Sequence, residues 1–166
     1  YKDAADPTCT PFELVSCDVF ITEATFGLPV FRHHDAPGEI AKLLHSVSVF
    51  PERAHLVGAY SLGKAQRVIA LLRRQGYDKP IYLHGAMEKI TSYYVGRGIA
   101  LGELRPVKGV KKAELAGTIT LAPPSATADL WTRRFPDPVT AFASGWMRVR
   151  ARARQSNAEL PLIVSE

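Results

Sequence analysis

Glu23 is the side chain whose type and placement most clearly indicate chemistry in this 166-residue chain. The apolar run Val19-Phe20-Ile21 precedes it, and Gly27 ends the turn that carries it. A carboxylate at the end of a hydrophobic strand costs free energy to bury unless a cation or a hydrogen-bond donor pairs with it. The pattern therefore favours a site residue, and an ordinary surface glutamate is the alternative that this segment leaves open.

A second segment, Ser144-Gly145-Trp146-Met147-Arg148, carries residue types that contact nucleic acid. Gly145 lets the backbone approach a ligand closely because it has no Cβ. The ring of Trp146 can stack on a base, and the guanidinium of Arg148 can reach a phosphate. The alternative is that Trp146 belongs to the core, where tryptophan is on average well buried.

Residues 58–64 fit the pattern GxxxxGK, which is typical of a loop that holds phosphates between a strand and a helix. The next residue is Ala65, whereas such a loop requires a Ser or Thr hydroxyl there to hold magnesium. Gly63 at the start of a helix can still present backbone amides to an anion. A tight turn between a strand and a helix is the alternative interpretation.

Few metal-binding side chains occur at a spacing that suits a metal ion. His33-His34-Asp35 brings donors together, but neighbouring side chains of an extended segment point in opposite directions. Cys9 and Cys17 form no CxxC pair, so two buried or half-buried thiols are expected instead of a metal site. His84 ends an apolar run, where it either lines a ligand crevice or is structural. His55 is expected to be structural.

The net charge of +5 comes largely from arginines late in the chain. These are Arg133, Arg134, Arg148, Arg150, Arg152 and Arg154. If the segment that holds the last four is a strand, their alternation puts them on one face, whereas a helix scatters them. A basic segment of this kind favours a polyanion such as nucleic acid, and a solvated arginine-rich face is the alternative.

The composition is typical of a globular domain, with 46% hydrophobic and 22% charged residues. No stretch of about 18 apolar residues is present, so no membrane-spanning segment and no membrane partner are expected. Two cysteines in the whole chain agree with a reducing compartment, and we expect a cytoplasmic location.

Short apolar runs alternate with segments of helical periodicity along the chain. Strands are predicted over residues 15–22, 54–60, 80–84, 118–122, 140–149 and 160–164. Helices are predicted over residues 38–50, 62–75, 87–96 and 126–135. This order is typical of the α/β class, with a mostly parallel sheet flanked by helices.

The segment Ile21-Thr22-Glu23-Ala24-Thr25-Phe26-Gly27 resembles the acidic motif E-[ST]-T-[YF]-G of metallo-β-lactamase nucleases that carry a β-CASP domain. Residues 57–67 are similar to the P-x-F-[SA]-L-G-R-A-Q-E segment of that family, and residues 143–147 resemble its later Ser-Gly strand. Within the superfamily, the chain is most similar to bacterial ligase-associated DNA exonucleases, which are often labelled mRNA 3′-end processing factors. The resemblance covers essentially the whole chain.

The resemblance implies a zinc-dependent nuclease that hydrolyses phosphodiester bonds in DNA, or in RNA, as an exonuclease in repair or 3′-end processing. Glu23 would orient a metal-binding histidine or act with it in proton transfer. Nucleic-acid contacts are implied for Ser144, Gly145, Trp146, Arg148, Lys64 and Arg67.

The family binds two zinc ions through an HxHxDH motif, a further His, a bridging Asp and a late His, and this chain lacks the first of these motifs. The bridging Asp typically lies in GDYK, whereas the chain begins at Tyr1-Lys2. The late His typically follows S-[DE], and the chain ends at Val164-Ser165-Glu166. We therefore expect a partial chain without metal ligands of its own, inactive alone, whose two zinc ions belong to the full-length enzyme.

The resemblance also implies a division of the chain. Residues 1–27 are expected at the edge of the metallo-β-lactamase domain, residues 28–150 in the β-CASP domain, and residues 151–166 in the return toward the first domain. The expected partners are DNA or RNA, with a DNA ligase or helicase encoded nearby. Two alternatives remain: a non-catalytic nucleic-acid-binding α/β module, and a nucleotide-binding enzyme that uses residues 58–64.

Overall fold

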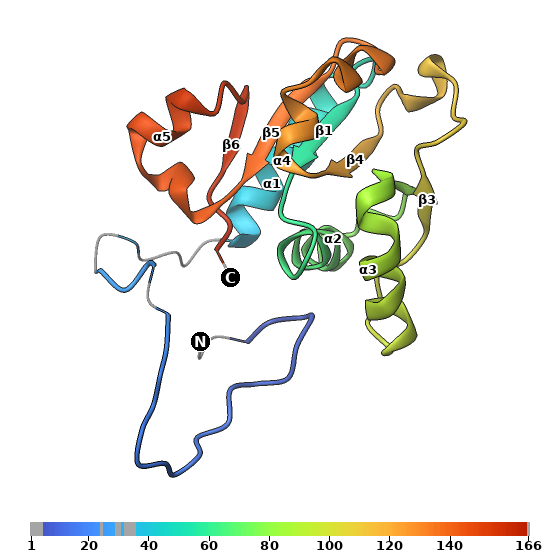
Figure 1. The fold of residues 1–166 in the computed structure, drawn as a ribbon. Coiled ribbons are helices and arrows are strands. Elements are labelled where there is room, and N and C mark those ends of the chain that lie inside the picture. The colour runs from blue at the N-terminus through green and yellow to red at the C-terminus, as the bar shows by residue number, and fades with distance from the viewer. Residues whose placement is uncertain (1–4, 24, 29–30, 32–35, 166) are drawn as a thin grey trace.

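A six-stranded parallel sheet forms the centre of the protein (Figure 1). The structure is a computed structural model, which describes residues 5–23, 25–28, 31 and 36–165. The strands are β1 (His55–Gly58), β2 (Ile81–Leu83), β3 (Leu104–Pro106), β4 (Ile119–Ala122), β5 (Val139–Ala143) and β6 (Leu160–Leu162). Their order in the sheet is β3-β2-β4-β1-β5-β6. The predicted α/β class with a parallel sheet is therefore confirmed.

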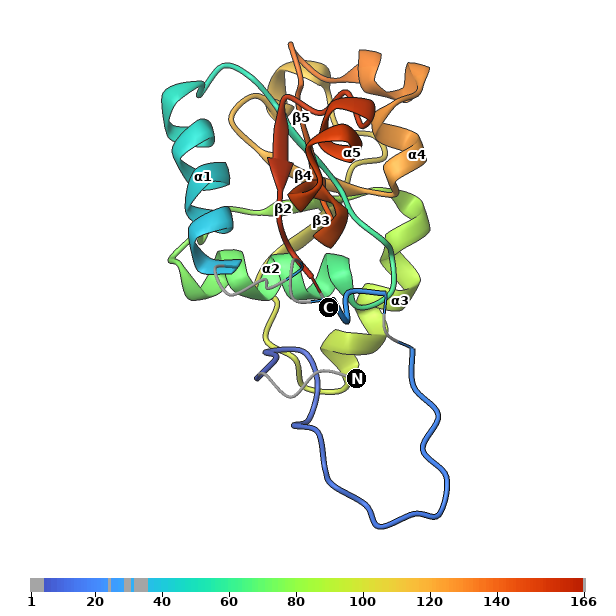
Figure 2. The same cartoon turned by 90° about the vertical axis from the view of Figure 1, so that its left-hand side faces the viewer.

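Helices cover both faces of this sheet. The α-helices are α1 (Ala36–Val49), α2 (Lys64–Arg74), α3 (Gly85–Gly96), α4 (Pro124–Thr127) and α5 (Arg150–Gln155). Short 3-10 helices are η2 (Lys112–Leu115), η3 (Leu130–Arg134) and η4 (Gly145–Arg148). Figure 2 shows α1 on one side of the sheet and α4 and α5 on the other. The predicted helix over residues 126–135 is thus two short helices, α4 and η3, with Asp129 capping the second.

Alternate residues of the strands fill two separate cores. On β1, Leu56 packs in the smaller core with Phe135, and Val57 packs in the larger one with α1, α2 and α3. All four residues of β1 are buried, because this strand has a neighbour on each side and helices over each face. An uninterrupted apolar run in the sequence, instead of a strict alternation, is the expected result of that position.

The chain leaves β1 and β5 in opposite directions across the sheet. From β1 it passes through α2 to β2, and from β5 it passes through η4 and α5 to β6 on the far edge. Neighbouring strands whose connections diverge in this way leave a crevice at their carboxyl ends, where open α/β sheets bind ligands. Residues that follow β1 and β5 therefore meet at one edge of the sheet.

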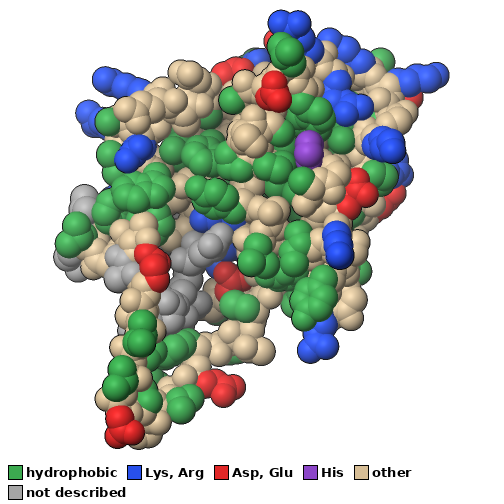
Figure 3. Space-filling model, in the orientation of Figure 1, with side chains coloured by type: hydrophobic (Ala, Val, Ile, Leu, Met, Phe, Trp, Pro, Cys, Tyr) green, Lys and Arg blue, Asp and Glu red, His purple; other side chains and the backbone are tan. Residues whose placement is uncertain are grey.

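The predicted strand over residues 15–22 is wrong. The segment is irregular and takes no place in the six-stranded sheet, and Ile21 is 90% exposed. Figure 3 shows hydrophobic side chains along this projecting segment. A strand requires a neighbour for its backbone hydrogen bonds, and an apolar sequence alone does not provide one. Cys9 and Cys17 lie in the same segment and are exposed, so the prediction of buried thiols is also wrong.

Gly117 holds the turn into β4 in a conformation that other residues adopt only with strain. Its φ is +65°, and a Cβ there would lie 2.7 Å from the carbonyl oxygen of Pro51. We expect Gly117→Ala to lower the free energy of unfolding by about 2–4 kcal/mol, because backbone strain and this contact must both be relieved. Gly76→Ala is the matched control, since Gly76 has φ +80° but open space around it. Urea denaturation of both variants measures the difference, and equal losses would contradict the close contact.

Candidate functional site

The turn after β5 presents Trp146 and Arg148 at the carboxyl edge of the sheet. The Ser144 hydroxyl caps η4 by accepting a hydrogen bond from the backbone N–H of Trp146 at 3.3 Å. Ser144 and Gly145 are buried, whereas Trp146 is 37% exposed and Arg148 is exposed. The predicted strand over residues 140–149 therefore ends at Ala143, and its second half is wrong. A serine cap competes with strand extension by satisfying the first free amide of the next helix.

Aromatic side chains join this turn to the segment that carries Glu23. The Trp146 ring lies edge to face with Phe26 and with Phe31, at centroid distances of 5.3 Å and 5.6 Å. Phe26 and Phe31 also contact each other, at 5.2 Å. Aromatic pairs at these distances are favourable beyond the area that they bury. The structure thus brings together two segments, residues 21–27 and 143–147, that the sequence separates by more than a hundred positions.

Glu23 is exposed, and Thr25 holds its carboxylate. The Oε1 atom accepts a hydrogen bond from the Thr25 backbone N–H at 2.5 Å and another from the Thr25 hydroxyl. These contacts form a turn that fixes the direction of the side chain without burying it. The acidic group therefore stands at the surface, three positions before the phenylalanine that contacts Trp146.

The late arginines form a helix instead of the predicted strand. In α5, Arg150 and Arg154 lie one turn apart on the same face, and Arg152 faces another direction. The Arg152 guanidinium carbon lies 5.6 Å from the centre of the Trp146 ring. The prediction that all of these arginines share one face is therefore wrong. The alanines between them, which have the highest helix propensity, were the sequence signal for a helix.

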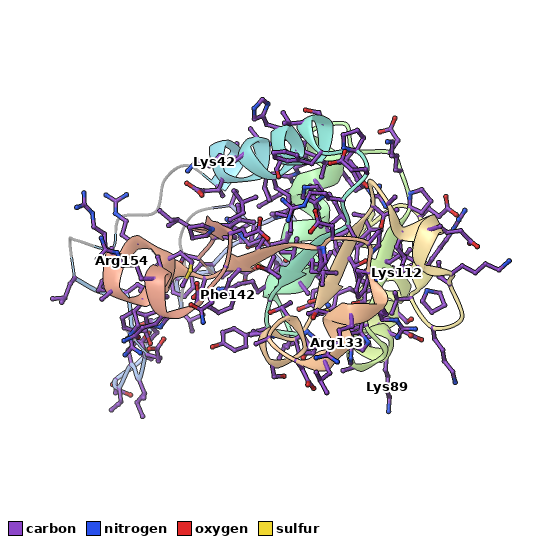
Figure 4. All side chains as sticks on the ribbon, turned by 90° about the horizontal axis from the view of Figure 1, so that it is seen from above. Lys42, Lys89, Lys112, Arg133, Phe142 and Arg154 are labelled. Atoms are coloured by element: carbon purple, nitrogen blue, oxygen red, sulfur yellow. The ribbon has the colours of Figure 1, made fainter. Side chains whose placement is uncertain are left out.

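Arg133 and Arg154 belong to separate basic groups. Figure 4 labels Arg154 at one end of the molecule, on α5, and Arg133 well away from it, on η3, where the Lys112 ammonium donates to the Arg133 carbonyl oxygen at 3.1 Å. Figure 3 shows Lys and Arg side chains gathered where Figure 1 draws α5. Arg152 of α5 is thus the arginine with a recorded contact to Trp146, and Arg133 lies in another part of the molecule.

Lys64 and Arg67 lie on α2, behind this edge. Both side chains are buried, and the Arg67 guanidinium forms an ion pair with Asp6. Burial alone would raise the pKa of Asp6, but hydrogen bonds from Thr8 and the Arg67 charge bring it below its ordinary value. In this arrangement the Arg67 charge is paired with Asp6, and direct contact of Lys64 and Arg67 with a nucleic acid stays a prediction.

Two backbone amides at the end of the turn over residues 58–64 donate to carbonyls of the same turn. Gly63 has a φ of 77°, the Lys64 N–H donates to the Leu62 carbonyl at 3.0 Å, and the Ala65 N–H donates to the Tyr60 carbonyl at 3.1 Å. Amides that are engaged in this way are not directed at a phosphate. The geometry is that of a tight turn between β1 and α2.

His84 is structural. Its Nδ1 accepts a hydrogen bond from the Ala86 N–H at 3.1 Å and so caps α3. Its ring packs in a T-shaped arrangement on Trp131, with the ring centroids 4.8 Å apart. The segment His33-His34-Asp35 lies outside the described residues. Among the residues that are described, no group of three or more His, Cys, Asp or Glu side chains could hold a metal ion.

His55 is fully buried on β1, with its Nε2 2.9 Å from the Ser46 hydroxyl. Burial, followed by the nearby Arg53 charge, lowers the pKa of His55 below its ordinary value. The unfolded chain therefore binds a proton more readily, and we expect stability to fall as the pH drops below about 6.5. Urea denaturation at pH 7.5 and pH 5.5 measures this loss. His55→Gln should reduce the pH dependence, exposed His45→Gln should not, and equal effects would contradict the assignment.

Two contacts at this site could not be predicted from the residue pattern, namely those of Trp146 with Phe31 and with Arg152.

A separate hollow of about 370 Å³ lies beside α3 and β3, and Glu88, Ser92 and Arg105 are among its lining residues. It lies near the opposite edge of the sheet from β6.

The chain is 29% identical over 149 residues to a "Probable DNA ligase" from Opitutus terrae. That match covers 86% of this chain and 13% of the ligase-named protein, so the chain spans a small part of its relative's length. No family model matches the chain. No solved structure matches it either. In the described part of the chain, no helix is both long and apolar enough to cross a membrane.

Proposed function

We propose that this chain is the β-CASP part of a zinc-dependent nuclease that hydrolyses phosphodiester bonds in DNA. The contact between Phe26 and Trp146 carries the proposal, because it joins the acidic segment to the turn that holds Arg148. Both segments meet where a parallel sheet of this topology binds ligands. Glu23, Ser144, Gly145, Trp146 and Arg148 line the proposed substrate path, with the charges of Lys64 and Arg67 beneath it.

The described residues do not fit a zinc site, because they include no suitable group of ligands. The proposed zinc ions therefore belong to a longer protein, and this chain alone is inactive. When bound there, they would supply the charge that activates water and stabilises the phosphorane-like transition state. The proposed role of Glu23 is to accept a hydrogen bond from a histidine outside this chain and so to fix its orientation.

The exposed apolar segment supports the proposed division into domains. Leu14, Val15 and Ile21 are 92%, 76% and 90% exposed, which is costly for three apolar side chains in one segment. We propose that residues 1–27 form the edge of a metallo-β-lactamase domain. Residues 28–150 form the β-CASP domain in this proposal, and residues 151–166, whose β6 pairs with β5, lead back toward the first domain.

The name of the Opitutus terrae relative supports DNA as the substrate. The activity that we propose is that of an exonuclease in DNA repair, which acts beside a ligase or helicase. We propose the cytoplasm as its location. RNA and 3′-end processing are the corresponding alternative. A non-catalytic nucleic-acid-binding module is the second candidate function, since exposed Trp146 and the arginines of α5 suffice for binding without chemistry.

The experiment uses a longer protein that contains residues 1–166, purified and tested for zinc content and for hydrolysis of DNA. We expect about two zinc ions per chain, cleavage of DNA, loss of cleavage with a chelator, and recovery when zinc is restored. Absence of both zinc and cleavage would contradict the nuclease. DNA binding without cleavage would favour the second candidate, the binding module.

A further inference from the structure

We propose that Trp146 and Arg152 form a base-stacking pair, and that the other arginines near them hold phosphates, so that the site selects single-stranded DNA. This inference rests on the proposed function for the choice of DNA, and it adds the form of the substrate. It draws on the charge, the exposure and the orientation of residues in η4 and α5.

The arginines of this surface lack acidic partners. Arg148, Arg150 and Arg154 are exposed, and none of them forms an ion pair within the part of the chain that the structure describes. Arg53, by contrast, pairs with both Asp137 and Glu159. Several like charges close together repel one another, and a bound polyanion relieves that repulsion while it releases counterions.

Trp146 is held in place yet remains accessible. The Phe26 and Phe31 rings lie in T-shaped contact with its ring, which restricts the side chain, and 37% of the residue is still exposed. A large aromatic ring that is fixed before binding loses little conformational entropy when a flat ligand stacks on it. The Arg152 guanidinium lies over the same ring, 5.6 Å from its centre, and a guanidinium can also stack on a nucleobase.

The helical arrangement separates two kinds of contact. Arg150 and Arg154 lie on one face of α5, whereas Arg152 is turned toward Trp146. Figure 4 shows Arg154 at the outer end of the molecule. A strand whose phosphates follow Arg148, Arg150 and Arg154 can turn a base toward Trp146. Bases of a duplex are stacked on each other, so only an unpaired base offers its face to this ring.

The first test is equilibrium binding of a labelled thymidine oligonucleotide to the 166-residue chain, measured by fluorescence anisotropy at several salt concentrations. We expect Trp146→Ala to weaken this binding about 10-fold, since stacking on one base is worth roughly that much. Binding of an abasic oligomer of the same length should be unchanged, because it has phosphates but no bases. Equal weakening of both oligomers would overturn the stacking role of Trp146.

The second test separates the phosphate contacts. A variant with Arg150→Ala and Arg154→Ala should weaken binding of both oligomers equally and reduce the salt dependence of log K by about 1.4, at about 0.7 per phosphate. Arg133→Ala with Arg134→Ala is the matched control on η3, and it should leave binding unchanged. An unchanged salt dependence in the α5 variant, or an equal effect of the control, would overturn the phosphate role.

A spectroscopic test reports the contact without relying on affinity. The chain has two tryptophans, so in Trp131→Phe selective excitation of tryptophan reports on Trp146 alone. We expect a thymidine oligonucleotide to quench this emission and an equivalent DNA duplex to do so at least 10-fold less at equal concentration. Equal quenching by duplex would overturn the selectivity, and at least 10-fold tighter binding of oligouridine would overturn the assignment to DNA. These binding and quenching measurements do not require hydrolysis. They therefore test the stacking role even if the longer protein does not hydrolyse DNA, so failure of the proposed function can be distinguished from failure of this inference.

Discussion

We expect Glu23→Gln to lower the rate of DNA hydrolysis by the proposed longer, zinc-loaded protein about 10- to 100-fold, which is the usual effect of losing a carboxylate that orients a metal-binding histidine. The amide keeps the size of the side chain, and its oxygen can still accept the bonds from Thr25 that form the turn. It cannot supply the negative charge that strengthens the bond to an imidazole. Affinity for DNA, which depends on η4 and α5, should change less than about twofold.

Steady-state hydrolysis and DNA binding are measured on the same preparations. Glu13→Gln is the matched control, because Glu13 is an exposed glutamate of the same irregular segment. It should leave both quantities unchanged. A Glu23→Gln enzyme with normal hydrolysis, or with a loss that comes entirely from weaker DNA binding, would contradict the proposed role.

Arg73→Ala should lower the free energy of unfolding by about 2–3 kcal/mol, the largest loss of stability that we expect from one polar side chain. The Arg73 guanidinium donates to four backbone carbonyls, at Leu101 (2.9 Å), Tyr77 (2.5 Å), Lys79 (2.7 Å) and Glu103 (2.6 Å). It ties the end of α2 to the loops that enter β2 and β3. Burial lowers the pKa of Arg73, but the group stays charged at every pH of interest.

The expected loss of unfolding free energy in Arg73→Ala is limited to this range because some of the freed carbonyls, those of Lys79 and Glu103, can bind water instead. Arg73→Lys should recover little of it, since an ammonium cannot reproduce the fork that reaches separate carbonyls. Arg74→Ala, at the exposed neighbouring position, is the control and should change stability by less than about 0.5 kcal/mol. Urea denaturation at pH 7 compares the variants. Equal stability of Arg73→Ala and Arg74→Ala would contradict the bridging role.

Periodicity predicted the central elements because burial produces it. Helix α2 places Val68, Ile69 and Leu72 on one buried face, and β1 is buried throughout because both of its faces are covered. Strand β3 was missed, since it is a three-residue edge strand that ends in a proline and has little apolar pattern. The segment 15–22 shows the opposite error: its residues favour a strand, but no described strand lies beside it to pair with.

The residue types at Trp146 and Arg148 predict contacts with nucleic acid, and these contacts stay a prediction. Trp146 and Arg148 stand at the surface, as a binding role requires. The alternation Arg-x-Arg-x-Arg suits one face of a strand, but the alanines between the arginines favour the helix that the structure has. The contact between Phe26 and Trp146 depends on the tertiary fold, and no local pattern in either segment predicts it. Arg67 illustrates the same limit, because its ion pair comes from distant Asp6.

Photocrosslinking tests most directly whether a single strand of DNA lies over η4 and α5. Single-stranded DNA that contains 5-iodouracil is bound to the protein and irradiated, and the attached residues are identified by mass spectrometry. We predict that crosslinks concentrate on Trp146 and its neighbours in residues 144–154, and that excess abasic oligomer competes for them less effectively than thymidine oligonucleotide. Crosslinks confined to Trp131 on η3, or to the hollow beside α3 and β3, would contradict the proposed site.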